Sequence, residues 1–351
     1  MKKIKIAVVT GPTATGKTAF AVRLAAELDG EIISADSRQV YRGLDIGSGK
    51  DISEYTLPSG RKIPVHLIDI VEPSYPYNLA EFMRDCHAAV AAVHDSGRLP
   101  VICGGTALYL DSILRSYSLQ GGAPDPAKRK EKRELPTEEL RRLLAEREPG
   151  SEILQREPEN RIRLIRRLEQ LEENPDSALL QSANALHPEY EFLVLGTLRT
   201  RAELHQRIEQ RLDDRLANGM LDEAVRLHQQ GVSWERLEFF GLEYRYMALH
   251  LQGKITFQEM RDQLLIKIRQ FAKRQDSWFR NMERNGIPIY WFPPEKFESA
   301  LELTRDFLAG TPLPEPEFKL SETYYGPRDP NNAASHSCKK PERRICPSRK
   351  P

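Results

Sequence analysis

A phosphate-binding motif near the beginning of the chain is the feature that most restricts its fold. Residues 11–18 read GPTATGKT, which matches G-x-x-x-x-G-K-[ST]. An apolar, β-branched run at 5–10 precedes the motif, and apolar residues with helical spacing follow it over 16–29. The glycines let backbone N–H groups turn towards phosphate oxygens, and the helix presents its positive end to them. The motif therefore predicts a di- or triphosphate site in which Lys17 adds a charge and the Thr18 hydroxyl binds Mg²⁺.

The alternation of strands and helices along the chain predicts an α/β fold. Helices are expected at 78–96 and 106–114, and the further strands at 31–35, 65–70, 99–103 and 190–198. Strands separated by helices favour a parallel sheet with helices on both faces. Ligands of such sheets collect at the carboxyl ends of the strands. The phosphate-binding motif should therefore lie at that edge.

Changes in composition and in predicted secondary structure divide the chain into three parts. We expect a catalytic core over 1–120 and 186–310, and a small all-helical insertion over 121–185, where charges of both signs are dense. Residues 311–351 are rich in proline and polar residues and are predicted to be a disordered tail. Long helices are expected at 200–230 and at 256–284, the second opening with a capping box of Thr256 and Glu259.

The helix at 256–284 is predicted to have an apolar and a basic side. The residues expected in the core are Leu264, Ile268, Phe271, Trp278 and Met282. The basic residues expected on the opposite side are Arg269, Lys273, Arg280 and Arg284. Such a stripe is compatible with a solvated face or with contacts to RNA phosphates.

The overall composition excludes some classes of protein. Lys+Arg total 52 and Asp+Glu total 51, so any nucleic-acid contact must come from local patches. The four cysteines form no C-x-x-C pair, which indicates neither a disulfide framework nor a zinc knuckle. No apolar run approaches the ~18 residues of a membrane span. We expect a cytoplasmic monomer without a membrane association.

Asp36 follows the predicted strand at 31–35 directly. Because strand ends share one edge of the sheet, its carboxylate should lie near the bound phosphates. There it could hold Mg²⁺ through water or accept a proton from a substrate. Position alone is equally compatible with a capping role, since aspartate is an ordinary helix or turn cap.

Six sequence blocks, in one order, resemble the tRNA dimethylallyltransferases, also called tRNA isopentenyltransferases. The blocks are GPTATGKT, SADSRQVYRGLDIGSGK, VHLIDI, GGTALYL, LHQRIEQRLDD and AKRQDSWFR. The resemblance extends over about residues 5–292 and leaves the tail outside it. The block around Asp36 and the AKRQDSWFR block are much more specific than the phosphate-binding motif.

The resemblance implies transfer of a dimethylallyl group from dimethylallyl diphosphate to a tRNA anticodon stem-loop. The acceptor would be the exocyclic amino nitrogen of the adenosine immediately 3′ of the anticodon, and diphosphate would be released. Asp36 would be the general base, with Thr106 and Lys17 also catalytic. The residues implied to bind the diphosphate are Gly11, Thr13, Ala14, Thr15, Gly16, Lys17, Thr18 and Arg211. Those implied or expected to contact tRNA are Asp36, Ser37, Arg38, Gln39, Thr106, Ile162, Arg163, Arg166, Lys273 and Arg280.

The chain departs from the usual family pattern in several places. The usual GGTGLY reads GGTALY with Ala107, and the usual DIGTAKP reads DIGSGKD, which brings in Gly49 and Asp51. Ile268 replaces a common threonine, and the block that usually reads GYRQ aligns uncertainly with GLEYRY. No zinc-finger pattern follows the core.

Three other functions remain open at this point. A phosphoryl-transfer enzyme such as a small-molecule kinase would also use the phosphate-binding motif, and a non-catalytic RNA-binding protein could retain the fold. A prenyltransferase of free adenine nucleotides is the third. The helical insertion and the basic helix are unnecessary for a mononucleotide, which favours tRNA.

Overall fold

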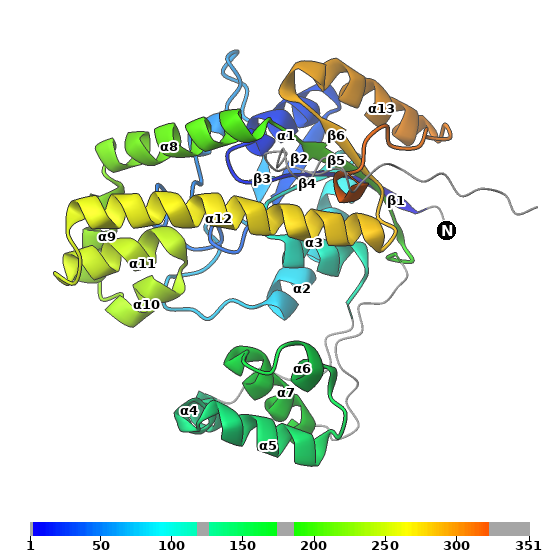
Figure 1. The fold of residues 1–351 in the computed structure, drawn as a ribbon. Coiled ribbons are helices and arrows are strands. Elements are labelled where there is room, and N and C mark those ends of the chain that lie inside the picture. Colours follow the sequence, from blue (N-terminus) through cyan, green and yellow to red (C-terminus); the bar gives the residue numbers. More distant parts are fainter. Residues whose placement is uncertain (1–2, 118–125, 174–185, 323–351) are drawn as a thin grey trace, which may run out of the picture.

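The core of the molecule is a six-stranded, fully parallel sheet with helices packed around it (Figure 1). The computed structural model describes residues 3–117, 126–173 and 186–322. Its strand order is β3-β2-β4-β1-β5-β6. The strands are β1 (Ile4–Thr10), β2 (Gly30–Ser34), β3 (Val65–His66), β4 (Leu99–Cys103), β5 (Tyr190–Thr197) and β6 (Ile289–Phe292). The predicted α/β class with a parallel sheet is confirmed.

Burial on both faces explains why these strands are almost continuously apolar. In β1, Ile6 and Val8 belong to one core cluster, whereas Ala7 and Val9 belong to the other. Successive side chains of a strand point to opposite faces, so both faces of β1 are covered. β3 is shorter than the predicted strand at 65–70 because Leu67 and Asp69 adopt positive φ angles of 63° and 55°, which interrupt the extended conformation.

Helices cover the two faces of the sheet. The face that carries Ala7 and Val9 packs against α1 (Lys17–Glu27) and α13 (Phe297–Ala309), whose Phe20 and Phe297 rings meet edge to face with centroids 5.2 Å apart. α2 (Leu79–Asp95) and α3 (Ala107–Leu114) contribute to the opposite cluster. The sequence interpretation did not include β6 or α13.

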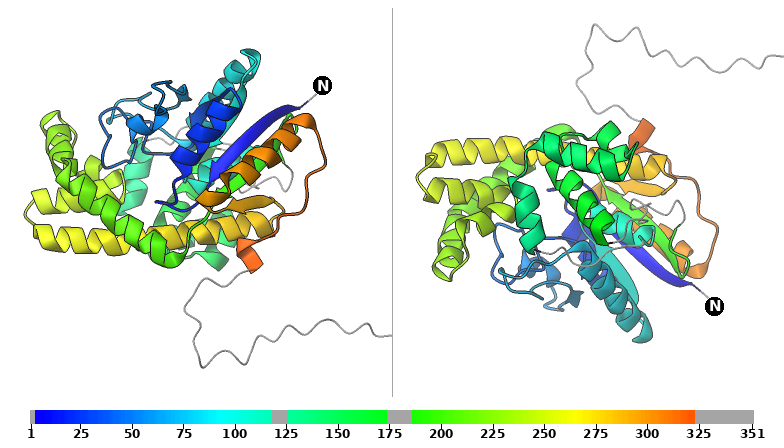
Figure 2. Two further views of the ribbon diagram at one scale, coloured as in Figure 1. Left: turned by 90° about the horizontal axis from the view of Figure 1, so that it is seen from above. Right: turned by 90° about the horizontal axis from the view of Figure 1, so that it is seen from below.

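Five further helices form a lobe beside the sheet (Figure 2). They are α8 (Arg201–Ala217), α9 (Met220–Gln229), α10 (Trp234–Phe239), α11 (Leu242–Leu251) and α12 (Phe257–Arg284). The single helix predicted at 200–230 is therefore wrong: Gly219, with φ +90° in the left-handed region, separates α8 from α9. The predicted capping box of α12 is confirmed, because Thr256 accepts from the Glu259 backbone and Glu259 caps the Thr256 N–H. No helix in the described ranges combines the length and apolar character needed to cross a membrane.

The described part of the insertion is entirely helical and has its own small core (Figure 1). Its helices are α4 (Pro126–Glu134), α5 (Thr137–Arg147), α6 (Glu152–Arg156) and α7 (Arg161–Glu173). The buried residues of this core are Leu140, Leu144, Leu164, Ile165, Leu168 and Leu171. An independent core is what a separately folded insertion requires.

The beginning of the predicted disordered tail is ordered. Leu320 is buried, and the backbone N–H groups of Leu320 and Ser321 donate to the Glu283 carboxylate at 3.1 and 2.6 Å. The Trp291 indole N–H donates to the same carboxylate at 2.6 Å. These contacts hold Leu320 and Ser321 against the core, which the prediction of a tail from 311 onwards did not anticipate. The rest of the predicted tail lies outside the described residues.

Candidate active site

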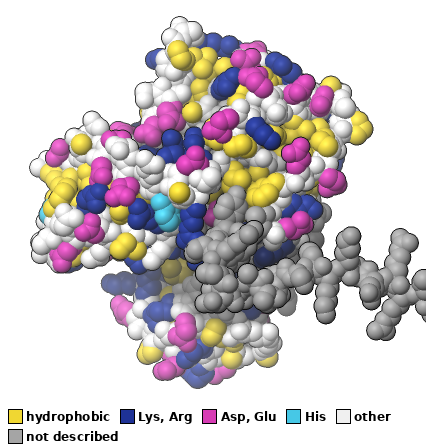
Figure 3. All heavy atoms as spheres, turned by 45° about the horizontal axis from the view of Figure 1, so that its top comes forward, with side chains coloured by type: hydrophobic (Ala, Val, Ile, Leu, Met, Phe, Trp, Pro, Cys, Tyr) yellow, Lys and Arg dark blue, Asp and Glu magenta, His cyan; other side chains and the backbone are white. Residues whose placement is uncertain are grey.

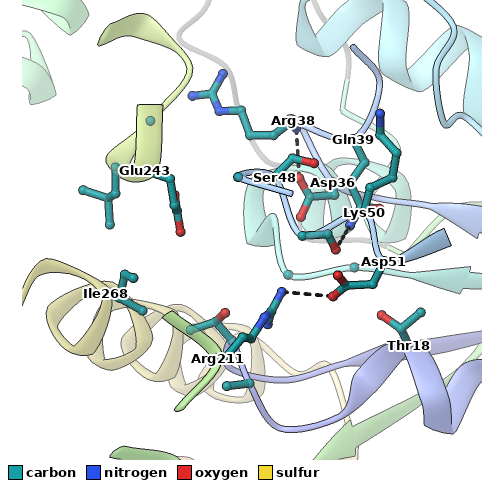
Figure 4. A pocket seen from close by; sticks show the side chains of 18 of the residues that line it. Thr18, Asp36, Arg38, Gln39, Ser48, Lys50, Asp51, Arg211, Glu243 and Ile268 are labelled. Carbon is teal, nitrogen blue, oxygen red and sulfur yellow. Dashed lines mark hydrogen bonds and ion pairs between the residues drawn. The ribbon is translucent and has the colours of Figure 1, made fainter. Parts of the chain in front are cut away.

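A large cleft opens at the carboxyl ends of the strands. Its volume is about 1340 Å³, and its walls come from the phosphate loop, from the segments after β2 and β4, and from α8, α11 and α12. Side chains from these elements point towards a common space (Figure 4). The cleft is therefore where the predicted phosphate site and the predicted carboxylate meet.

The backbone of the phosphate loop is held in a conformation that needs its glycines. Gly11 has φ +145° and Gly16 has φ +92°, and a Cβ at Gly11 would lie 2.6 Å from the Thr197 carbonyl oxygen. The Thr13 N–H donates to Gln275 Oε1 of α12 at 2.9 Å. Thr13, Ala14, Gly16, Lys17 and Thr18 line the cleft, as the motif predicts.

Thr15 turns its side chain away from the cleft. Its hydroxyl donates to the Pro12 carbonyl oxygen at 2.8 Å and lies 2.6 Å from the Thr197 hydroxyl, with the side chain buried. Gly11 is likewise absent from the cleft wall. The expected diphosphate contact of these two residues is therefore restricted to the backbone, and the Thr15 hydroxyl braces the loop.

Lys17 faces the cleft with its charge uncommitted. Its ammonium donates to the Pro12 carbonyl oxygen at 2.7 Å, and it forms no ion pair with the described residues. Burial lowers the pKa of Lys17 to about 8. Because a desolvated ammonium without a counterion gains most from an added negative charge, Lys17 is suited to bind a phosphate oxygen.

Three arginines on one face of α8 form the opposite wall of the phosphate site. Arg207 Nε donates to the Ala14 carbonyl oxygen at 3.0 Å, and Arg211 and Arg215 lie 3.6 and 3.2 Å from the Asp51 carboxylate. Burial, with neighbouring Arg215 acting in the same direction, lowers the pKa of Arg211 to about 10. Sequence reasoning identified only Arg211. The i, i+4, i+8 spacing of the three arginines would have indicated the other two.

The structure shows what two residues of DIGSGKD do where this block departs from the usual DIGTAKP. Gly49 has φ +71°, and a Cβ at this position would lie 2.2 Å from Arg215 Nη2 and 2.3 Å from Arg211 Nη2. Asp51, two residues on, supplies the carboxylate that pairs with both guanidinium groups. Gly49 and Asp51 therefore act together: one leaves space for the two arginines, and the other balances part of their charge.

Glu223 fixes the loop that carries these two residues. Its carboxylate accepts from the backbone N–H groups of residues 45, 46 and 47 at 2.7–3.0 Å and from the Tyr244 hydroxyl at 2.7 Å. Lys50 is fully buried and donates to the Tyr41 carbonyl oxygen at 3.0 Å. The loop is thus attached to the protein through both Glu223 and Lys50.

Asp36 lies where the sequence predicted it, at the end of β2 and on the cleft wall. Its Oδ1 accepts from the Arg38 backbone N–H at 2.9 Å, and Oδ2 has no hydrogen bond to the described residues. The Thr106 hydroxyl accepts from the Ser37 N–H at 3.2 Å, which ties the segments after β2 and β4 together. One carboxylate oxygen is thus anchored while the other remains available to a substrate.

Gln39 lies in the cleft wall, but its amide is largely committed within the protein. It donates to the Gly49 carbonyl oxygen at 3.1 Å and accepts from the Ser34 hydroxyl at 2.9 Å. These bonds give Gln39 a role in holding the 45–51 loop, and its contact with tRNA stays a prediction. Arg38 remains on the cleft wall, where its guanidinium carbon lies 5.5 Å from the centroid of the exposed Phe239 ring.

Glu243 is a carboxylate of the cleft that sequence reasoning missed. It points into the same space as Asp36 and Arg211 (Figure 4). Burial raises the pKa of its carboxyl, and nearby Asp36 acts in the same direction, whereas Arg215 and Arg211 oppose the shift. Its block, GLEYRY, aligns only uncertainly with the usual GYRQ, so the fold was needed to place this carboxylate in the cleft.

The cleft-facing side of α12 differs from the prediction. Phe271 and Trp278, expected in the core, are 38% and 36% exposed and line the cleft together with Arg274. Leu264 and Met282 are buried as predicted, and Ile268 is partly buried and also lines the cleft. The side toward the core instead includes Met260, Leu265, Ala272 and Phe279.

The predicted basic stripe of α12 faces elsewhere. Neither Lys273 nor Arg280 lines the cleft, and Arg269 is paired with Glu209 at 2.9 Å. The face in Figure 3 shows Lys and Arg side chains interspersed with Asp and Glu, in keeping with the balanced composition. Contact of Lys273 and Arg280 with RNA stays a prediction.

The predicted tRNA-binding residues of the insertion lie on α7, away from the cleft wall. Ile162 is 81% exposed, Arg163 pairs with Glu157, and Arg166 lies 3.4 Å from Glu169. An isoleucine this exposed does not serve the insertion's own core. Its role in tRNA binding also stays a prediction.

Comparison with known proteins agrees with the geometry. The family model described as IPP transferase matches residues 39–282, and the one described as isopentenyl transferase matches residues 4–66. A tRNA dimethylallyltransferase 1 of Syntrophus aciditrophicus is 44% identical over 301 residues, which cover 85% of this chain and 96% of that protein. The chain belongs to the tRNA dimethylallyltransferase family. A second member, from Trichlorobacter lovleyi, is 45% identical over 81% of this chain and 90% of its own length.

Solved structures place the fold in the same family. The tRNA isopentenylpyrophosphate transferase of Bacillus halodurans has a TM-score of 0.62 at 32% identity, covering 88% of this chain and 96% of that one. A eukaryotic dimethylallyltransferase acting on tRNA has a TM-score of 0.73 at 22% identity, covering 89% and 81%, and shows likeness of fold alone. The family expected from the sequence blocks is confirmed.

Proposed function

We propose that this enzyme transfers the dimethylallyl group of dimethylallyl diphosphate to the exocyclic amino nitrogen of an adenosine in tRNA. The acceptor is the adenosine immediately 3′ of the anticodon. One observation carries the proposal: the phosphate loop, the arginines of α8 and the free oxygen of Asp36 open onto the same cleft. Membership of the family supports the choice of donor and acceptor.

The chemistry explains why these groups belong together. The adenine amino group is a poor nucleophile because its lone pair is conjugated with the ring. It attacks the allylic carbon as the bond from that carbon to the diphosphate oxygen breaks, and its proton passes to Asp36 Oδ2. Lys17, Arg211 and the loop N–H groups stabilise the charge that grows on the leaving diphosphate.

Mg²⁺ is the cofactor that the phosphate loop implies. The donor set fits a hard cation, since the Thr18 hydroxyl lies on the cleft wall with the carboxylates of Asp51 and Glu54. Burial raises the pKa of Glu54, with neighbouring Asp51 contributing in the same direction. A bound Mg²⁺ would neutralise negative charge on the diphosphate. Thr18 would be its direct protein ligand.

The assay that tests the function compares two acceptors of the dimethylallyl group and, separately, ATP as an alternative donor. Labelled dimethylallyl diphosphate should transfer its label to a tRNA anticodon stem-loop, and mass analysis of the nucleosides should show the gain on one adenosine. Free AMP should accept far less label. Stoichiometric ADP formation from γ-labelled ATP, coupled to a phosphorylated product, would instead favour a kinase.

Arg274 and Lys273 offer a matched comparison of the two sides of α12. Arg274 lines the cleft, where its charge would contact an RNA phosphate. We therefore expect Arg274→Ala to weaken stem-loop binding and to reduce the log–log slope of affinity against salt by about one unit or less. Lys273→Ala removes the same charge from outside the cleft wall. The stem-loop affinity of both variants, measured at several salt concentrations, tells which side of α12 contacts the RNA. Equal effects from both variants would place RNA on both sides of the helix.

Gly49→Ala tests the space around the two arginines. An added Cβ would collide with the Nη2 atoms of Arg211 and Arg215 and would strain a backbone with φ +71°. We expect both guanidinium groups to be displaced and the KM for dimethylallyl diphosphate to rise about tenfold, with unchanged affinity for the stem-loop. Gly60→Ala is the control, because its φ is also positive at +82° and a Cβ there meets open space. An equal KM in both variants would contradict this interpretation.

A further inference from the structure

α12 presents an aromatic stripe to the cleft, formed by Phe271, Arg274 and Trp278. Residues three, four and seven apart lie on the same side of a helix, so the three side chains follow one line along it. The guanidinium carbon of Arg274 lies 5.8 Å from the centroid of the Phe271 ring. Two large rings therefore flank one cation over about two helical turns.

The fold itself does not require these rings. The core-facing side of α12 is already filled by Leu264, Phe279 and Met282, which are almost completely buried. Phe271 and Trp278 instead leave 38% and 36% of their surface open. Exposed aromatic rings within a cleft are more typical of a ligand-binding surface than of side chains that pack a core.

The position of the stripe relative to the reacting groups is fixed by Gln275. Its side chain accepts from the Thr13 N–H at 2.9 Å and donates to the Gly105 carbonyl oxygen at 2.8 Å. α12 is thus attached both to the phosphate loop and to the segment that carries Thr106. A ligand that lies on the aromatic stripe is held in a defined register with the site of transfer.

The charge of the cleft indicates what the stripe binds. The arginines that line the cleft are Arg38, Arg207, Arg211, Arg215, Arg245 and Arg274. Together with Lys17 and Lys50 they outnumber the carboxylates of the same wall, which are Asp36, Asp45, Asp51, Glu54, Asp214 and Glu243. Such a wall favours a polyanion over an apolar peptide. Unpaired RNA combines phosphates with flat bases, and proteins bind it by stacking those bases on aromatic rings and arginine planes.

We propose that Phe271 and Trp278 stack the unpaired loop bases that flank the reacting adenosine, with Arg274 contacting a phosphate between them. This rests on the proposed function, since it places the anticodon loop in the cleft. Stacking the neighbours would stabilise the loop in an opened form while the acceptor base enters the site beside Asp36. The two rings would then determine affinity for the opened loop, with little influence on binding of the diphosphate.

The test separates ring stacking from apolar contact. Phe271→Leu and Trp278→Leu keep apolar side chains but remove the rings, whereas Phe271→Tyr and Trp278→Phe keep them. We expect each leucine variant to lose about tenfold in stem-loop affinity, and each aromatic variant to stay close to the original. The salt slope and the affinity for dimethylallyl diphosphate should not change, and the latter also shows that the variants are folded. Ile266→Ala is the control, because Ile266 is 52% exposed on the same helix but does not line the cleft.

A direct readout uses 2-aminopurine placed on either side of the reacting adenosine. Its fluorescence should be quenched on binding to the original enzyme, and the quench should be lost at one position with each leucine variant. If the enzyme transfers the prenyl group but the leucine variants keep both affinity and quench, the stacking proposal is wrong while the function stands. If the original enzyme neither binds the stem-loop nor prenylates it, both proposals are wrong.

Discussion

Asp36→Asn is expected to lower the rate of prenyl transfer by about 10²–10⁴-fold, because the variant can no longer accept the amino proton. Asparagine keeps an oxygen for the Arg38 backbone N–H, so the strand end should retain its conformation. Affinity for the stem-loop and for dimethylallyl diphosphate should therefore change little. Single-turnover rates with both substrates saturating measure the chemical step itself.

Glu243→Gln is the matched control for Asp36. It removes a second carboxylate from the same cleft, but it leaves the end of β2 untouched. We expect a much smaller loss of rate than in Asp36→Asn. If Asp36→Asn keeps more than about a tenth of the original rate, Asp36 is not the general base. A larger loss in Glu243→Gln would transfer that role to Glu243.

Lys17→Met should reduce the transfer rate by about a hundredfold or more, because it removes a preorganised positive charge from the leaving diphosphate. Binding of dimethylallyl diphosphate should also weaken, whereas affinity for the stem-loop should be unchanged. Rates measured over a range of diphosphate concentrations separate the two effects. Lys62→Met is the control, since Lys62 is exposed and lies outside the cleft. A normal transfer rate at saturating dimethylallyl diphosphate would show that Lys17 contributes only to binding of that substrate and not to the chemical step.

The parts of the fold that the sequence predicted well are those with a strong local signal. The strand at 99–103 and the phosphate loop were placed correctly, because buried β-branched runs and a fixed glycine spacing are local properties. β6 was missed because it has only four residues, and the division of helix 200–230 depended on one glycine in a left-handed conformation. Short elements and single hinge residues carry little periodic signal.

The candidate site shows the same division between local and tertiary information. Lys17 and Asp36 were predicted because a motif and a strand end define their positions. Phe271 and Trp278 were assigned to the core because apolar residues occupy more than one side of α12, and helical angles alone do not tell which side meets a cleft. The commitment of Gln39 to Gly49 likewise depends on a loop closure that no spacing reveals.

The bridge that Gln275 makes between Thr13 and Gly105 has a thermodynamic consequence. The helix that carries the aromatic stripe is also hydrogen-bonded to the loop proposed to hold the diphosphate, so α12 contacts both proposed ligand sites. If occupancy of the stripe stabilises the loop in its binding conformation by a given factor, the diphosphate must increase the affinity for RNA by the same factor. Such reciprocity would let the enzyme retain its reactive donor most firmly when the acceptor is already in place.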